Sequence, residues 1–345
     1  MKEKKVFAMI LAIAMTMGLT ACGGSTSSDA DNSESDSDKL LVQIAYTNNP
    51  GEPIDDAAQE WQRLIEEKSN GSIEVQLFPS SQLGSQTDLM DQMLIGEPII
   101  HITDGSFLAD YGAPEMAIIS APYVFDEWEQ CWKLLETDWW EEQEELLAEN
   151  GLHIVTANWM FGERNIMTVK PVRTLEDMSG LIMRTPPTFS YMKAFELMGA
   201  APTAMAAADV YTALQQGSVD GLENVFSFLY GQSYYEVASY ITLTKHVKMP
   251  SQWVCSQLWW DGLTEEQQTI IAESGDEAGL MNNEIQASSE ESYIEMMKEK
   301  GVEIIDLSDA ERARFEEAAS GLYEDPTITA GWRDGLLEYI QELVK

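Results

Sequence analysis

The sequence predicts an α/β fold in which helices cover mainly parallel sheets, divided between two domains. Runs of β-type residues alternate with amphipathic helical patterns along the chain, as they do in parallel sheets with helical crossovers. The chain has 345 residues, which is more than one hydrophobic core usually serves, so two domains are expected. Its apolar content of 44% and its 10 tryptophans are typical of a folded, well-buried protein.

Residues 1–21 are expected to be a lipoprotein signal peptide. Three lysines among the first five residues precede an unbroken apolar run, Val6–Met15, which is too short to remain as a bilayer-spanning anchor. The motif Leu19-Thr20-Ala21-Cys22 then resembles a lipobox, so we expect Cys22 to carry a membrane anchor of acyl chains such as palmitate. An ordinary signal peptide with an incidental cysteine is the alternative.

Residues 22–39 are predicted to form a flexible tether that is acidic and rich in serine. A segment with almost no apolar side chains cannot bury enough surface to offset the entropy lost on ordering. The folded head of the protein is therefore expected to begin at residue 40.

The first predicted domain comprises residues 40–160 together with 250–289. In order, its first part should contain a strand at residues 40–46, a helix around 57–65, a strand at 72–78, a helix around 89–94, a strand at 99–103, a helix at 126–150 and a strand at 152–158. Ligands of open α/β sheets bind outside the carboxyl ends of strands. This rule nominates Thr47, Asn48, Thr103 and Asp104 for the rim of a pocket.

The second predicted domain comprises residues 161–249 together with 290–345. Its strands should lie near residues 165–169, 181–184, 201–205 and 240–245, with helices near 190–198 and 207–216. The chain should then return to the first domain, where a strand is expected at 251–257. A capping box at Thr264-Glu265-Glu266-Gln267 predicts a long helix that runs toward Lys300 and spans both domains. Ser308 should cap a further helix, and residues 331–344 show an amphipathic pattern.

Charge and composition exclude several classes of function. A formal charge of −39 argues against nucleic acid as a partner, because the field of the whole protein repels phosphates. The three cysteines and three histidines show no metal-binding spacing, so we expect neither a metal nor a cofactor. Cys131 and Cys255 are interpreted as small buried hydrophobic residues, although a disulfide between them stays open.

Arginines cluster in the middle of this acidic chain. Three of its seven arginines, Arg164, Arg173 and Arg184, lie within 21 positions. The planar guanidinium group binds a carboxylate through two parallel, charge-assisted hydrogen bonds. The cluster therefore predicts a site for a small carboxylate.

The surrounding motif identifies a family. The sequence Asp177-Met178-Ser179-Gly180-Leu181-x-x-Arg184 is followed by Asp209-Val210-Tyr211-x-Ala213-Leu214-Gln215-x-Gly217-x-Val219-Asp220-Gly221-x-Glu223-Asn224. From about residue 40 onward the chain resembles the solute-binding subunits (DctP family) of tripartite ATP-independent periplasmic (TRAP) transporters. In that family the arginine matching Arg184 forms a salt bridge with the ligand carboxylate, and Arg164 and Asn224 match two further ligand contacts.

The resemblance implies a binding protein rather than an enzyme. It implies a two-lobed fold of the periplasmic-binding-protein kind that closes on an organic acid outside the cytoplasm. The partners it implies are the small and large integral membrane subunits of the transporter, and we expect a monomer. Pro187 and Ala207 depart from the branch that binds sialic acid, which leaves C4-dicarboxylates, keto or hydroxy acids and sugar acids as ligands.

Other residues are weaker candidates for the ligand site. Trp159 and Tyr211 lie near the predicted crevice and either wall it or belong to the core. Glu223 is suited to accept hydrogen bonds from ligand hydroxyls, with a hinge or surface role equally open. Asn48 and Thr103 are candidates as strand-end residues. Glu163, the neighbour of Arg164, is expected to neutralise part of its charge.

Two other functions compete with solute binding. A lipid-anchored extracellular glycoside hydrolase is compatible with the 59 acidic residues, since such enzymes need only two carboxylates. A surface adhesin would bind a macromolecule and no small ligand. No nucleophile elbow or cysteine–histidine set supports catalysis, and solute binding is therefore the preferred prediction.

Overall fold

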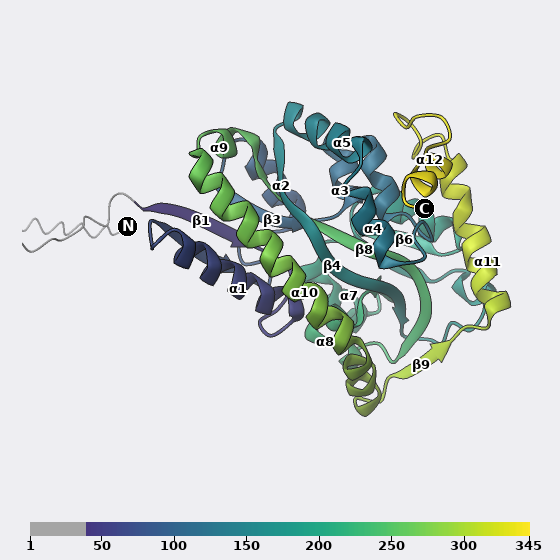
Figure 1. Cartoon of the computed structure of the whole chain (residues 1–345). Coiled ribbons are helices and arrows are strands. Elements are labelled where there is room, and N and C mark those ends of the chain that lie inside the picture. Colours follow the sequence, from purple (N-terminus) through teal and green to yellow (C-terminus); the bar gives the residue numbers. More distant parts are fainter. Residues whose placement is uncertain (1–38) are drawn as a thin grey trace, which may run out of the picture. The chain divides into compact units, whose positions relative to one another are not determined.

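A mixed sheet of nine strands runs through residues 39–345, the part of the chain that this computed structural model describes (Figure 1). Its strands lie in the order β2-β1-β3-β8-β4-β7-β5-β6, and β9 pairs with β8. Their bounds are Leu40–Ala45 (β1), Ile73–Phe78 (β2), Ile99–Thr103 (β3), Leu152–Thr168 (β4), Ile182–Thr185 (β5), Ala201–Ala204 (β6), Gly221–Asn224 (β7), Tyr240–Ser256 (β8) and Glu303–Asp306 (β9). Five of these eight strand pairings are parallel, so the predicted mainly parallel sheet is confirmed.

The strands β4 and β8, each 17 residues long, form an antiparallel pair in the middle of the sheet. The end of β8 pairs with β3, whereas the end of β4 pairs with β7. Because β4 and β8 are antiparallel, the two outer parts of the sheet attach to opposite ends of this central pair. Two of the three boundaries expected between the lobes, after residues 160 and 249, fall within this pair, and all three boundaries remain predictions.

The sequence analysis was wrong in dividing each long strand into two. The strands expected at 152–158 and 165–169 are both part of β4, and those expected at 240–245 and 251–257 are both part of β8. Gly162 interrupts the β pattern with a φ of 134°, but the pairing of β4 with β8 continues across it through shifts of register. Such shifts accommodate residues that a regular ladder would exclude.

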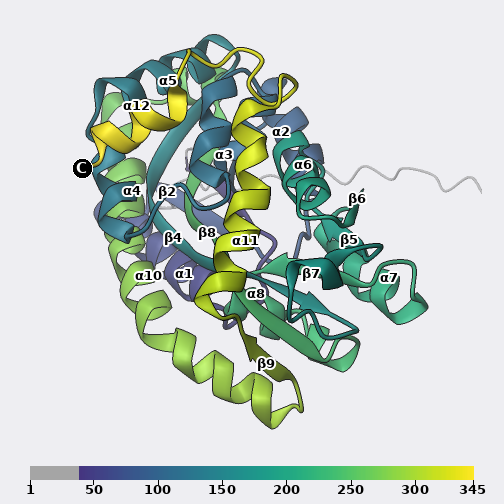
Figure 2. The ribbon, with the colours of Figure 1, turned by 90° about the vertical axis from the view of Figure 1, so that its right-hand side faces the viewer.

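Helices cover both faces of the sheet. Alternate residues of the strands, such as Ile154 and Val155 in β4, belong to two different hydrophobic clusters because successive strand side chains point to opposite faces. One cluster packs under α1 (Pro53–Lys68), α7 (Val210–Gln216), α8 (Phe226–Gly231), α9 (Gln257–Asp261) and α10 (Glu265–Glu299). The other packs under α2 (Gln86–Leu94), α3 (Gly105–Asp110), α4 (Trp128–Leu134), α5 (Asp138–Glu149), α6 (Phe189–Leu197), α11 (Asp309–Ser320) and α12 (Leu336–Leu343). In this second layer α11 lies beside α6 (Figure 2), and α12 packs against α4.

The long helix α10 confirms the helix predicted from the capping box. The Thr264 side chain accepts a hydrogen bond from the backbone of Gln267, and the helix then continues for 35 residues along β4 and α1 (Figure 1). The close approach of α10 to β4 depends on glycine, because a Cβ on Gly279 would lie 2.8 Å from the Trp159 ring. Trp159 in turn donates a hydrogen bond from Nε1 to the carbonyl of Gly275, 3.0 Å away.

Three further predictions are settled by the fold. The helix expected at 126–150 is instead two helices, α4 and α5, because Thr137 caps the second one by accepting a hydrogen bond from the backbone of Trp140. Cys131 and Cys255 are free and buried, in clusters on opposite faces of the sheet, which explains why they form no disulfide. The cap at Ser308 is confirmed.

The signal peptide, Cys22 and the tether lie outside the described residues. Within residues 39–345, none of the helices combines the length and the apolar character that a membrane crossing requires.

Candidate functional site

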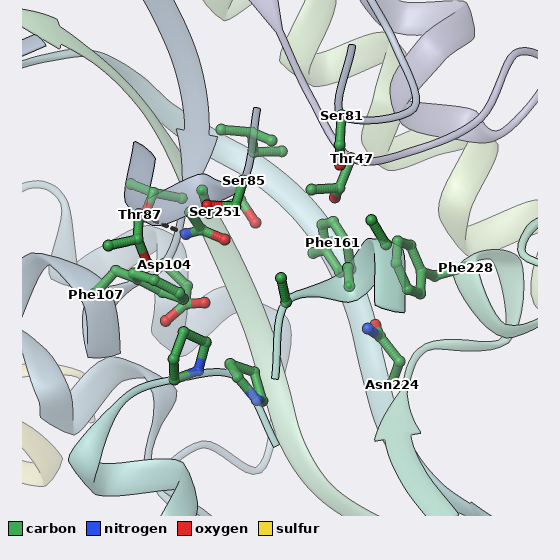
Figure 3. A pocket seen from close by; sticks show the side chains of 18 of the residues that line it. Thr47, Ser81, Ser85, Thr87, Asp104, Phe107, Phe161, Asn224, Phe228 and Ser251 are labelled. Atoms are coloured by element: carbon green, nitrogen blue, oxygen red, sulfur yellow. Dashed lines mark hydrogen bonds between the residues drawn. The ribbon is translucent and has the colours of Figure 1, made fainter. Parts of the chain in front are cut away.

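A cavity of about 320 Å³ opens where several strands end (Figure 3). The carboxyl ends of β3, β5 and β7 contribute to its wall together with inner residues of β4 and β8. It is lined by Thr47, Ser81, Gly84, Ser85, Gln86, Thr87, Ile102, Thr103, Asp104, Phe107, Phe161, Arg164, Arg184, Pro186, Pro187, Ala206, Ala207, Ala208, Asp209, Asn224, Phe228, Met249 and Ser251. The position agrees with the rule that ligands of such sheets bind outside strand ends.

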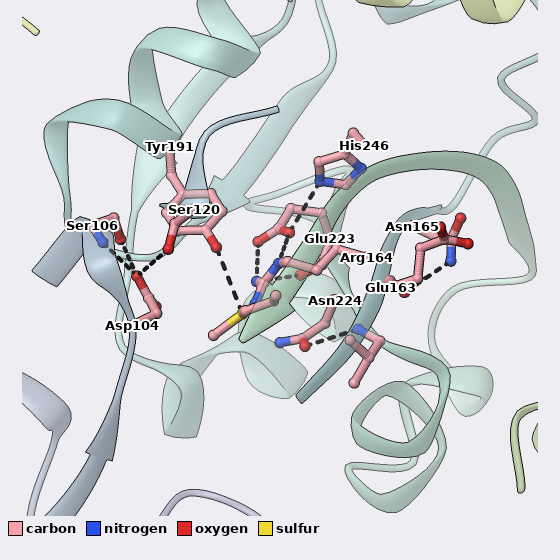
Figure 4. Close-up of polar contacts among 12 residues, drawn as sticks. Asp104, Ser106, Ser120, Glu163, Arg164, Asn165, Tyr191, Glu223, Asn224 and His246 are labelled. Carbon is pink, nitrogen blue, oxygen red and sulfur yellow. Dashed lines mark hydrogen bonds and ion pairs between the residues drawn. The ribbon is translucent and has the colours of Figure 1, made fainter. Parts of the chain in front are cut away.

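Arg164, on β4, is held by a buried carboxylate. Its Nε and Nη2 donate to the two carboxylate oxygens of Glu223, each 2.5 Å away, and both side chains are almost completely buried (Figure 4). Nε2 of His246 lies 3.3 Å from the same carboxylate. Burial alone would raise the pKa of Glu223, but the charge of Arg164 and the hydrogen bonds from His246 and Arg164 lower it to about 2. The charge of Arg164 is therefore already compensated inside the protein.

The prediction that Glu163 neutralises Arg164 is wrong. Neighbouring residues of a strand point to opposite faces, so the Glu163 side chain lies away from the guanidinium group of Arg164. Glu163 instead accepts a hydrogen bond from Nζ of Lys248 at 2.9 Å and pairs with Lys245 at 3.2 Å.

Arg184, near the end of β5, is buried, and its side chain contacts no carboxylate among the described residues. Its Nε donates to the backbone carbonyl of Met205, 2.9 Å away, and the residue is only 4% exposed. Among residues 39–345, none of the ion pairs includes Arg184. Burial accordingly lowers its pKa, since a charge in an apolar surrounding is disfavoured. Arg184 thus brings to the wall of the cavity a buried positive charge that forms no direct ion pair within residues 39–345.

Asn224 ends β7 with its amide group held in place. Its Oδ1 accepts a hydrogen bond from the backbone of Val225 at 2.8 Å, whereas its Nδ2 donates to none of the described residues (Figure 4). The register of β7 against β4 pairs Asn224 with Asn165, the residue after Arg164. The sheet therefore brings the Asn224 amide to the same cavity as the two arginines.

The rest of the wall combines hydroxyl groups, one buried carboxylate and aromatic rings. Nε2 of Gln86 donates to Oγ1 of Thr103 at 2.8 Å, and Asp104 follows at the end of β3. Phe107, Phe161 and Phe228 supply apolar surface (Figure 3). A mainly apolar lining with a few fixed polar groups is typical of small-molecule sites.

The structure brings four of the eight predicted ligand residues to the cavity: Arg184, Arg164, Asn224 and Thr103. Glu223 lies behind Arg164 and does not line it. Trp159 is fully buried between α10 and the rings of Trp61 and Trp253.

Asn48 and Tyr211 also lie outside the cavity wall. Nδ2 of Asn48 donates to Glu52 at 2.7 Å, and the hydroxyl of Tyr211 donates to Glu236 at 2.7 Å.

The sequence analysis overlooked the aromatic wall and the segment at residues 81–87, which comprises the loop before α2 and the first two residues of that helix. The loop follows the carboxyl end of β2, so the strand-end rule that nominated Thr103 would also have found Ser81. Nothing in the pattern around Phe161 or Phe228 distinguishes a cavity wall from core. Across the described residues there is no group of three or more histidine, cysteine, aspartate or glutamate side chains with the geometry for a metal ion.

Comparison with known proteins gives a consistent result. A family model described as bacterial extracellular solute-binding protein, family 7 (DctP), matches residues 44–328. Among curated proteins, the 2,3-diketo-L-gulonate-binding periplasmic protein YiaO of Escherichia coli (strain K12) is 28% identical over 285 residues, which cover 82% of this chain and 86% of that protein.

Two solved structures are similar over most of the chain. One is a TRAP periplasmic solute-binding protein from Ochrobacterium anthropi with bound L-fuconate, at 37% identity and a TM-score of 0.85, covering 89% of this chain and 100% of the other. The second, from Actinobacillus succinogenes 130z with bound L-galactonate, has 35% identity and a TM-score of 0.84, covering 88% and 99%. This similarity confirms the predicted two-lobed α/β fold of the periplasmic-binding-protein kind.

Proposed function

The chain belongs to the DctP family of bacterial extracellular solute-binding proteins, the solute-binding subunits of TRAP transporters, and on this premise we propose that it captures a sugar acid. In this proposal Arg184 binds the carboxylate of the ligand, with Asn224 as a further donor. The observation that carries it is the buried positive charge of Arg184, which has no carboxylate partner among the described residues. A bound carboxylate supplies that partner.

The cavity suits a small hydroxylated acid. Its volume of about 320 Å³ is near the lower end of the range for small-molecule sites, roughly 300 to 1,000 Å³. Its wall offers hydroxyl and amide groups of Thr47, Ser81, Gln86, Thr87 and Ser251 for ligand hydroxyls. The similar proteins hold L-fuconate and L-galactonate, which are acids of this kind. We therefore propose a sugar acid in preference to a C4-dicarboxylate or keto acid.

The charged groups of the cavity wall support the proposal of a binding role without turnover. A glycoside hydrolase requires two carboxylates that flank the bond to be cleaved. In this cavity Asp104 is buried, but the other lining carboxylate, Asp209, is exposed at the rim. We propose that the two lobes close on the acid and that the protein then delivers it to the membrane subunits of the transporter.

A thermal-shift panel tests the class of ligand. L-galactonate, L-fuconate and 2,3-diketo-L-gulonate should raise the unfolding temperature, and succinate, pyruvate and neutral galactose should have smaller effects. A ligand at 100 times its Kd stabilises the folded state by about 2.7 kcal/mol, which such an assay resolves. A shift with galactose that equals the shift with galactonate would contradict binding through the carboxylate.

Membrane attachment through Cys22 is a separate proposal, based on the Leu19-Thr20-Ala21-Cys22 motif. Cys22→Ala should leave the precursor unprocessed or release the protein from the membrane fraction, because several acyl chains together hold a protein at a bilayer. Detergent-dependent fractionation and mass spectrometry of the N-terminus would measure both effects. A variant that fractionates like the wild type, with a mature N-terminus elsewhere, would refute the proposal.

A further inference from the structure

We propose that Asp104 selects the tail of the ligand, so that the cavity accepts monocarboxylates with hydroxylated tails and rejects acids that carry a second negative charge. The inference rests on the proposed function, because it takes Arg184 as the partner of the ligand's carboxylate. It concerns the side of the cavity that lies across from Asn224 (Figure 3). Asp104 lies on that side, and within residues 39–345 it is the buried one of the two acidic residues in the cavity wall.

The Asp104 carboxylate is fixed by one of its oxygens and open at the other. Oδ1 accepts hydrogen bonds from the backbone N–H of Ser106 at 2.8 Å, from its hydroxyl at 2.5 Å and from the hydroxyl of Ser120 at 3.2 Å (Figure 4). Oδ2 accepts no hydrogen bond from any residue in the described range 39–345. Asp104 is only 4% exposed, and it lines the cavity. A positioned carboxylate oxygen is therefore available to a ligand.

The charges around the cavity leave no cation for a second acidic group. Arg164 is compensated by Glu223, so Arg184 is the lining cation that still lacks a counter-charge within residues 39–345. No lysine belongs to the lining residues. A ligand carboxylate on Arg184 completes one ion pair and leaves Asp104 as the remaining buried charge of the wall. A second ligand carboxylate would then face a like charge in a surrounding that screens it poorly.

A ligand hydroxyl group that faces the Asp104 carboxylate is favoured. It donates a hydrogen bond to the Asp104 carboxylate, and such charge-assisted bonds are about twice as strong as neutral ones. Ser251 adds a further partner nearby in the wall, since its hydroxyl is fully buried and has no hydrogen bond in the described structure. Asp104 therefore combines an attraction for the hydroxylated tail with a repulsion of diacids, the usual basis of specificity.

Galactonate and galactarate form a matched pair of probes. They share the same six-carbon hydroxylated chain, but galactarate carries a second carboxylate where galactonate has its terminal hydroxymethyl group. By calorimetry at neutral pH, the wild-type protein should bind galactonate at least about 10-fold more tightly than galactarate. Asp104→Asn should weaken galactonate binding by about 10- to 100-fold and strengthen galactarate binding, which reduces or reverses the preference. Asparagine keeps the size of the side chain and an acceptor oxygen for Ser106 and Ser120.

Asp126→Asn is the control, because it removes one acidic charge from an exposed residue that does not line the cavity. It should leave the preference for galactonate unchanged, and thermal unfolding without ligand should confirm that both variants are folded. If the wild type binds galactonate and a folded Asp104→Asn variant keeps the same preference, the inference is overturned while the proposed function stands. If the wild type binds galactonate no better than it binds neutral galactose, the proposed function fails, and the inference fails with it.

Discussion

Replacing Arg184 with alanine is expected to weaken binding of the sugar acid by about 30- to 5,000-fold. Arg184 is buried at the cavity wall, so in the proposed complex the ligand carboxylate and the guanidinium group would form a pair removed from water, and the loss of one member would leave the other charge buried alone. Truncation of such a pair costs roughly 2 to 5 kcal/mol. Arg184→Lys should recover only part of this affinity, because one ammonium group does not reproduce the two parallel hydrogen bonds of arginine. Calorimetry with galactonate measures both effects.

Arg173 provides a control from the same arginine cluster. It is exposed and paired with Glu303, and it does not line the cavity. Arg173→Ala should therefore bind galactonate like the wild type. Near-wild-type affinity in a folded Arg184→Ala protein would show that the carboxylate is held elsewhere.

Glu223→Gln is expected to lower the free energy of unfolding by about 3 to 5 kcal/mol, because it leaves the buried Arg164 without its counter-charge. Chemical denaturation of the ligand-free protein would measure this loss. Glu163→Gln is the matched control, since the ion pairs of Glu163 with Lys245 and Lys248 are partly exposed. Its effect should stay below about 1 kcal/mol.

The contribution of Glu223 should also depend on pH. The charge of Arg164 outweighs burial and holds the pKa of Glu223 at about 2 in the folded protein, below the ordinary value of 4.5. The stabilisation is therefore complete above pH 4.5 and is lost as the pH falls toward 2. The difference in stability between wild type and Glu223→Gln should shrink over this interval.

A double variant separates pairing from packing at the same position. Arg164→Met combined with Glu223→Leu leaves neither member of the pair buried alone, so it should be more stable than Glu223→Gln. A double variant as unstable as Glu223→Gln would mean that lost packing, rather than an unpaired charge, causes the effect.

Local patterns in the sequence were sufficient for most elements of the fold. The strand β3 occupies the predicted residues 99–103, and the capping box at Thr264 marks the start of α10. The errors in strand length arose where the extent of a strand depends on the strand with which it pairs. Glycine is disfavoured inside strands, so Gly162 predicts the end of a strand. In the structure, β8 nevertheless pairs with β4 on both sides of Gly162. The sequence of β4 alone does not contain that information.

The site shows the same division between local pattern and tertiary contact. The motif around Arg184 and Asn224 led to two residues that the sheet brings to one cavity. The partner of Arg164 was missed because Glu223 lies 59 positions away and reaches it only through the pairing of β7 with β4. Trp159 was nominated by its place in the chain, but its side chain is fully buried in the core against Trp61 and Trp253.

The central strand pair has a mechanical consequence. If the two ends of the sheet approach each other around a ligand, we expect β4 and β8 to bend, because these paired strands connect both ends of the sheet. The shifts of register around Met160 and Gly162 are the places where that ladder is already interrupted, so they bend most easily. Arg164 lies two residues further along the same strand. If the lobes close on a ligand as proposed, we therefore expect the bend to lie next to the backbone that carries this arginine.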